Sequence, residues 1–151
     1  MTLRFVYQRI GVTRPLASLH GRKDRPRPYI NVSLLGPTGI AIEKALIDTG
    51  ADDTVFPEWI AWKIGIDLSN APSATSGGMG GGSGLLRFAQ ITLRVADNKE
   101  RREWQAWVGF TTAPLRHSLL GYAGFLQYFT ATFHGEREEV ELTVNGLYPG
   151  V

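Results

Sequence analysis

Ala45-Leu46-Ile47-Asp48-Thr49-Gly50-Ala51-Asp52-Asp53-Thr54-Val55 is the most informative stretch of this 151-residue sequence. An apolar run typical of a strand ends there in Asp48-Thr49-Gly50, which places a carboxylate where the chain turns. Asp, Thr and Gly are all common in turns, so the tripeptide by itself indicates only a turn. The order of motifs in the rest of the chain gives the segment a more specific meaning.

The composition is that of an ordinary globular protein. The length favours one domain, and 43% hydrophobic with 20% charged residues is enough apolar content for a real core. The sequence has no cysteine, which excludes a disulfide framework, thiol catalysis and thiolate metal sites. No leader pattern precedes the body, and no apolar run approaches the ~20 residues that span a bilayer. These features predict a cytoplasmic protein.

Charge is distributed unevenly along the chain. Residues 1–28 contain seven Lys or Arg and one acid, a net charge of +6, whereas the remainder has nine basic and thirteen acidic residues, a net charge of −4. A basic arm on an acidic body could bind nucleic acid, but no interleaved aromatic residues or recognition motif accompany the charges. We therefore expect a solvated N-terminal extension. The arm could equally dock on the acidic body of its own or a partner chain.

Glycine and proline residues divide the sequence into short segments, which predicts mostly short strands. Residues 3–12 resemble a strand, and residues 13–28 resemble a linker or surface arm. Hairpins are expected over 29–47, 86–110 and 131–144, and short helices over 57–65 and 122–129. The predicted domains are an extension over 1–28, an all-β body over 29–145 and a tail over 146–151.

Segment 45–55 closely resembles the active-site segment of the retropepsins, the single-domain aspartic proteases of retroviruses and their cellular and bacterial relatives. Two further motifs follow in the family's order. The glycine-rich stretch 76–84 lies where the family has its flap, and Ser118-Leu119-Leu120-Gly121 is similar to its hydrophobic-hydrophobic-Gly segment. The resemblance covers about residues 27–130. It implies an all-β retropepsin-like half-barrel with one or two short helices, active as a two-fold homodimer.

Aspartic protease chemistry needs two carboxylates. One takes a proton from the attacking water while the other protonates the carbonyl oxygen, and two carboxylates ~3 Å apart share one proton. The sequence contains a single Asp-Thr/Ser-Gly motif, so the second carboxylate must be Asp48 of another copy. The expected function is therefore aspartic endopeptidase activity in a homodimer, with an extended polypeptide as substrate and no cofactor or metal.

The resemblance also implies roles for individual residues. The catalytic segment would be Asp48, Thr49 and Gly50, with Thr49 interlocking with its partner across the two-fold axis. The expected substrate-binding residues are Ala51, Asp52, Asp53, Gly78, Met79, Gly80, Gly81, Leu119 and Leu120. Arg27 resembles the arginine that pairs across the retroviral dimer with the Asp equivalent to Asp52. Tyr122 departs from the family, which usually has an arginine there.

Several alternatives stay open. The glycine-rich stretch lacks the Lys-Ser/Thr of a phosphate-binding loop, but could be a flexible linker instead of a flap whose loop is disordered in the free protein. His20, His117 and His134 show no metal-ligand spacing, and no Gly-x-Ser-x-Gly elbow is present. A non-catalytic peptide- or protein-binding module with a retropepsin fold remains the alternative function.

Overall fold

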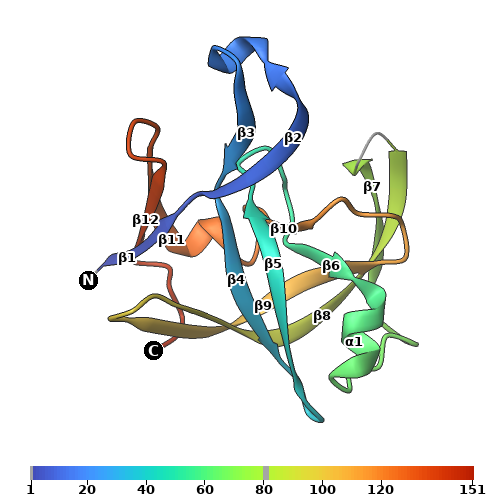
Figure 1. The fold of residues 1–151 in the computed structure, drawn as a ribbon. Helices are drawn as coiled ribbons and strands as arrows, with labels where there is room; N and C mark the ends of the chain where they lie inside the picture. The colour runs from blue at the N-terminus through green and yellow to red at the C-terminus, as the bar shows by residue number, and fades with distance from the viewer. Residues whose placement is uncertain (1, 80–81) are drawn as a thin grey trace.

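A computed structural model describes residues 2–79 and 82–151, and strands make up most of that part of the chain (Figure 1). The body is built on a seven-stranded sheet in the order β4-β5-β10-β6-β9-β8-β7. β4 also pairs with β8, which curls the sheet into a half-barrel. Its strands are β4 (Tyr29–Leu35), β5 (Ile40–Ile47), β6 (Val55–Pro57), β7 (Ser73–Met79), β8 (Gly82–Ala96), β9 (Arg101–Thr111) and β10 (Ser118–Leu120).

The expected hairpins of the body are confirmed. β4 pairs antiparallel with β5, and the long strands β8 and β9 pair over Arg87 to Ala96. Alternation along β8 and β9 sends Leu93, Trp104 and Val108 into the core. Trp104 packs on Phe125 and Phe129 with ring centroids 5.8 and 5.3 Å away. The all-β architecture expected from the sequence is therefore present.

A second, three-stranded sheet joins the two ends of the chain in the order β1-β12-β11. β11 (Phe129–His134) and β12 (Glu139–Val144) form the hairpin expected around Gly135, and β1 (Thr2–Val6) pairs antiparallel with β12. The sequence suggested one strand over 3–12. That strand is interrupted at Tyr7, whose N–H donates to the Glu138 carbonyl at 2.7 Å, and the chain then leaves this sheet.

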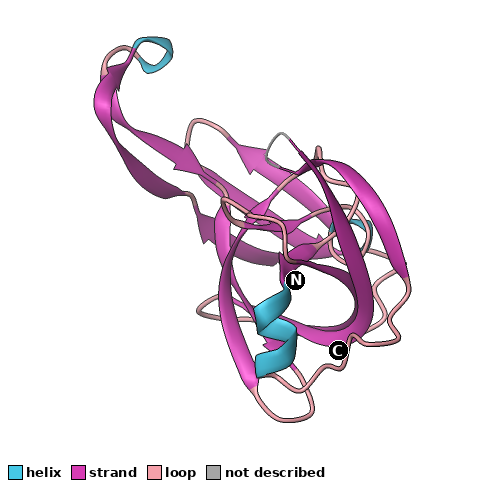
Figure 2. Ribbon diagram, turned by 90° about the vertical axis from the view of Figure 1, so that its right-hand side faces the viewer, coloured by secondary structure: helices cyan, strands magenta, loops and turns pink. Residues whose placement is uncertain are grey.

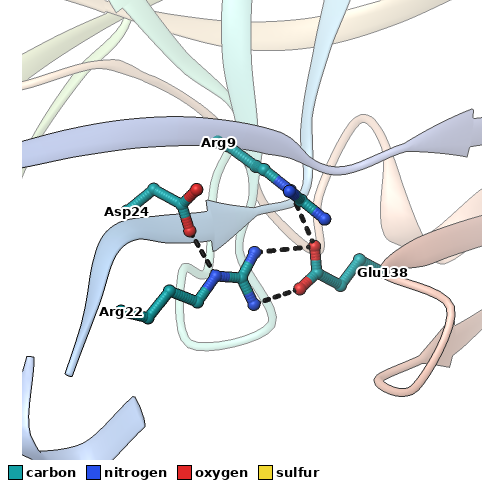
Figure 3. A network of polar contacts seen from close by, with 4 residues as sticks. All are labelled: Arg9, Arg22, Asp24 and Glu138. Atoms are coloured by element: carbon teal, nitrogen blue, oxygen red, sulfur yellow. Dashed lines mark hydrogen bonds and ion pairs between the residues drawn. The ribbon is translucent and has the colours of Figure 1, made fainter. Parts of the chain in front are cut away.

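The segment expected to be a linker or surface arm forms a hairpin. β2 (Gln8–Leu16) pairs with β3 (Arg22–Arg27), and a short 3₁₀ turn, η1 (Ala17–Leu19), connects them. The hairpin projects from the body in Figure 2. Glu138 ties the hairpin to the body: it accepts hydrogen bonds from Arg9 of β2 and from Arg22 of β3, while Arg22 also contacts Asp24 (Figure 3). These contacts join residues more than 110 positions apart in the sequence, so local sequence patterns do not predict the hairpin.

Protonation of Glu138 is expected to loosen the hairpin. Hydrogen bonds from Arg22 hold the pKa of this carboxyl below its ordinary value. A carboxyl whose pKa falls on folding stabilises the folded state above its ordinary pKa, and this stabilisation is lost as the pH drops through the lowered value. Glu138→Gln should therefore speed hydrogen exchange of the hairpin amides severalfold at pH 7, and the difference from wild type should vanish in acid. A constant difference across that range would contradict the role of the carboxylate.

The helices are short. α1 (Glu58–Lys63) begins after Pro57 and its chain turns at Gly65, whose φ of +88° suits glycine, as the sequence predicts. The helix expected over 122–129 is only the 3₁₀ turn η2 (Leu126–Tyr128). Among the residues that the structure describes, no helix is long and apolar enough to cross a membrane.

Candidate active site

Asp48 lies directly after β5, at the start of the connection to β6. Its backbone N–H donates to the Leu120 carbonyl at 3.0 Å, which extends the parallel pairing of β5 with β10 by one residue. On the other side, the N–H of Ile47 donates to the Pro28 carbonyl at 3.1 Å, at the base of the β2–β3 hairpin. The backbone around Asp48 is thus held from two sides by segments distant in sequence.

The turn itself orients the carboxylate. The N–H of Gly50 donates to Asp48 Oδ1 at 2.8 Å, and the N–H of Ala51 donates to the Asp48 carbonyl at 3.2 Å. A Cβ at position 50 would lie 3.2 Å from Asp48 Oδ1, so glycine lets the N–H approach the carboxylate without crowding. Thr49 and Gly50 are exposed, and Asp48 is half-buried. The three expected catalytic residues therefore form one turn at the protein surface.

Backbone contacts with the chain after β10 support the rest of the loop. Tyr122 N–H donates to the Ala51 carbonyl and Ala123 N–H to the Asp52 carbonyl, both at 2.9 Å. Gly121 makes this approach possible, because a Cβ there would lie 2.3 Å from the Asp53 carbonyl oxygen and 2.7 Å from that of Ala51. The Leu-Leu-Gly segment therefore packs directly against the Asp-Thr-Gly segment.

Three residues that brace this arrangement were not identified from the sequence. Thr54 is fully buried and its Oγ1 donates to the Ala123 carbonyl at 2.9 Å. Trp104 Nε1 donates to the Gly124 carbonyl at 3.0 Å, and Gln127 Oε1 accepts from the Gly124 N–H at 2.7 Å. Thr54 is the only one with a sequence signal, since it adjoins the motif. The other two are brought to the site by tertiary packing.

Asp52 and Asp53 lie on the strand-like segment after the turn. Asp52 is exposed and Asp53 is half-buried. Burial raises the pKa of Asp53, and the charge of neighbouring Asp52 raises it further. Within residues 2–79 and 82–151, neither carboxylate has a basic partner within 4.0 Å. Arg27, expected to pair with Asp52 of another copy, likewise forms no ion pair in that part of its own chain.

The two leucines of the second motif have different environments. Leu119 is half-buried and packs against a small apolar cluster of Val55, Leu86, Phe88 and Leu115. Leu120 is fully buried in the main core, and its carbonyl accepts from Asp48. Leu120 was expected to bind substrate; in this chain its side chain is covered by core residues, and its carbonyl supports the turn.

The glycine-rich stretch lies in the β7–β8 hairpin. β7 pairs with β8 from Ser73 opposite Arg87 to Met79 opposite Gly82. Gly78 and Met79 are therefore part of a paired strand and not of a flexible linker. Gly80 and Gly81, also expected to bind substrate, lie outside the described residues.

A polar group lies between the hairpin base and the Asp48 turn. Tyr29 Oη lies 2.9 Å from His117 Nδ1, and Lys44 Nζ lies 5.0 Å from the Tyr29 ring centroid. Burial lowers the pKa of His117, the nearby charge of Arg27 lowers it further, and Asp48 opposes the shift.

No protein-family model matches the chain, and no curated protein matches it in sequence. Solved structures do match, and they identify the fold as that of the retropepsin-like proteins. One of the 45 matching chains is the crystal structure of a retropepsin-like aspartic protease from Rickettsia conorii. The TM-score is 0.53 at 17% sequence identity, and the alignment covers 94% of this chain and 91% of the other. The fold expected from the Asp48 segment is thereby confirmed.

Proposed function

We propose that this protein is an aspartic endopeptidase whose active site forms between two copies of the chain. The observation that carries the proposal is the Asp48 turn. On a retropepsin-like fold, a carboxylate is held at the surface by the Gly50 N–H, and its backbone is braced by Leu120 and Pro28. A surface turn tied down this thoroughly is suited to positioning a reacting group.

The chemistry follows from pairing two such turns. Two Asp48 carboxylates facing each other across a two-fold axis share one proton, because both cannot ionise comfortably at short distance. The ionised member takes a proton from a water held between them as the water oxygen bonds to the carbonyl carbon, and the protonated member gives its proton to the carbonyl oxygen. The C–N bond of this tetrahedral intermediate then breaks: the first carboxyl gives its proton to the leaving nitrogen, and the second takes one back from a hydroxyl of the intermediate, which restores the shared proton. Each copy supplies half of this machinery. The exposed Thr49 and Gly50 give the turn a surface through which a second turn can approach.

The β7–β8 hairpin and the apolar cluster beside Leu119 supply the substrate cleft in this proposal. Glycine backbone in the hairpin permits N–H groups to come close to an extended peptide, and the hairpin serves as a flap. Leu119 packs at the edge of the core next to Val55, directly after the loop that contains Asp53. An extended polypeptide with apolar side chains fits these surroundings.

Activity should depend on the population of dimers. Below the dimer dissociation constant, specific activity is expected to rise in proportion to protein concentration, because the complete site exists only between two copies. Cleavage of an unfolded protein at mildly acidic pH, with parallel sedimentation, measures both quantities. A statine-type transition-state mimic should block cleavage. Constant specific activity from a species that sediments as a monomer would contradict the proposal, and mimic binding without any cleavage would indicate a peptide-binding module.

A further inference from the structure

The β2–β3 hairpin has two faces with different partners. Successive residues of a strand point to opposite faces, and in β3 this separates Arg22 and Asp24 from Lys23, Arg25 and Arg27. The inner face contains Arg22, Asp24 and Arg9 from β2, and it is bound to Glu138 of the same chain (Figure 3). The basic arm therefore docks on the acidic body through this face.

The outer face keeps its charges unpaired. Lys23 and Arg25 are exposed, and Ile10 pairs with Arg25 across the hairpin. In the described parts of the chain, Lys23, Arg25 and Arg27 have no acid within 4.0 Å. The outer face continues into a hollow of about 280 Å³. This hollow is lined by Ile10, Tyr29, Glu43, Lys44, Arg116 and His117.

The hollow adds cations to the outer face. Lys44 and Arg116 also lack an acid within 4.0 Å in the described residues. The one acid in the lining, Glu43, accepts a hydrogen bond from Ser118 Oγ at 3.2 Å. Tyr29 and His117 of the hollow adjoin the two segments that hold the backbone at Asp48: the N–H of Ile47 donates to the Pro28 carbonyl, and β10, which begins directly after His117, pairs with β5. This cationic surface therefore reaches the side of the Asp48 turn.

We infer that the outer face of the hairpin is a dimerisation arm that binds a second copy of this chain. The inference rests on the proposed dimeric active site, because the Asp48 turn is complete only with a second copy beside it. Charge favours that occupant: residues 29–151 have a net charge of −4, and Asp52 and Asp53 beside the turn have no basic partner in the described chain.

The composition of the arm favours protein over nucleic acid. Ile10 and Val12 are half-buried apolar residues on β2, and no Phe, Tyr or Trp occurs between residues 8 and 27 to stack on bases. The Tyr29 ring in the adjoining hollow already packs against Lys44 and His117. In a two-fold dimer the arm of each copy would contact the body of the other copy, so every favourable interaction would occur twice.

The test is the dimer dissociation constant of the full chain, measured by sedimentation equilibrium without substrate. Lys23→Glu/Arg25→Glu is expected to raise this constant about 10- to 100-fold, since like charges then face the acidic partner. Lys99→Glu/Arg101→Glu is the matched control, because both residues are exposed at the β8–β9 turn and the charged groups of their side chains form no ion pair within the described residues. The control should dimerise like wild type.

Other results would overturn the inference. They are a wild-type monomer at all concentrations, or an unchanged constant in the hairpin variant. If circular dichroism shows that this variant is misfolded, Lys23→Ala/Arg25→Ala replaces it, and its dimer dissociation constant is expected to rise about 10-fold.

Fluorescence anisotropy with a labelled single-stranded RNA and a DNA duplex tests whether the arm binds nucleic acid instead. If wild type binds nucleic acid tightly, and the hairpin variant loses this binding while its dimer dissociation constant stays unchanged, the arm is a nucleic-acid-binding element instead. A wild-type dimer that never cleaves peptides would refute the proposed function and leave the arm to be judged by its dimer constant.

Discussion

Asp48→Asn is expected to lower kcat/KM for peptide cleavage by roughly four orders of magnitude or more. The amide neither accepts the proton of the attacking water nor shares a proton with its partner, and one substitution removes both carboxylates of the proposed homodimer. The Gly50 N–H donates to Asp48 Oδ1 at 2.8 Å, and the amide oxygen of the variant side chain can accept the same hydrogen bond. The fold and the dimer should therefore persist.

Steady-state kinetics on a fluorogenic peptide and sedimentation of the same preparation measure the two halves of this prediction. Asp67→Asn is the matched control, since within the described residues the Asp67 carboxylate bonds only to Ser69, in an exposed turn remote from Asp48 in sequence. Its activity should equal that of wild type. Undiminished cleavage by the Asp48→Asn protein would remove the basis of the aspartic-protease assignment.

Gly121→Ala is expected to reduce kcat by about 100-fold and to destabilise the fold by about 1–3 kcal/mol. The added methyl would lie 2.3 Å from the Asp53 carbonyl oxygen and 2.7 Å from that of Ala51. Both contacts are with backbone, so no side chain can rotate away, and the loop after Asp48 must shift. The shift displaces the turn because Leu120, the adjacent residue, binds the Asp48 N–H.

Gly135→Ala provides the comparison for this substitution. A Cβ at position 135 meets nothing within 4 Å, so a methyl there should change neither activity nor stability appreciably. Thermal unfolding and kinetics of both variants separate loop displacement from a general effect of glycine replacement. Wild-type kcat in a folded Gly121→Ala protein would show that the two motifs are not mechanically linked.

Local patterns predicted the parts of the fold that depend on local chemistry. The β4–β5, β8–β9 and β11–β12 hairpins follow from alternating residues around turn formers. The β2–β3 hairpin was missed because Pro15 and Pro26 are typical of linkers, and the contact that holds the hairpin involves Glu138, far away in sequence. The break at Tyr7 has the same cause, since its N–H is taken by the Glu138 carbonyl.

The candidate site divides in the same way. Asp48, Thr49 and Gly50 form a contiguous motif, so the turn could be predicted from sequence. Its support could not, because the Trp104–Gly124 hydrogen bond exists only once β9 packs beneath the loop. The different environments of Leu119 and Leu120 could not be predicted either, because the two residues are identical in type and only the packing of β10 beside β5 buries one and leaves the other half-buried.

The pairing of β1 with β12 has a genetic consequence. Each copy completes its own terminal sheet, with Thr2–Val6 held against Glu139–Val144, so in the proposed dimer subunits can exchange without unfolding that sheet. A cell that makes equal amounts of intact and Asp48→Asn chains would then assemble about one quarter of its dimers with both carboxylates. Asp48→Asn chains would therefore also lower the activity of the intact chains made in the same cell.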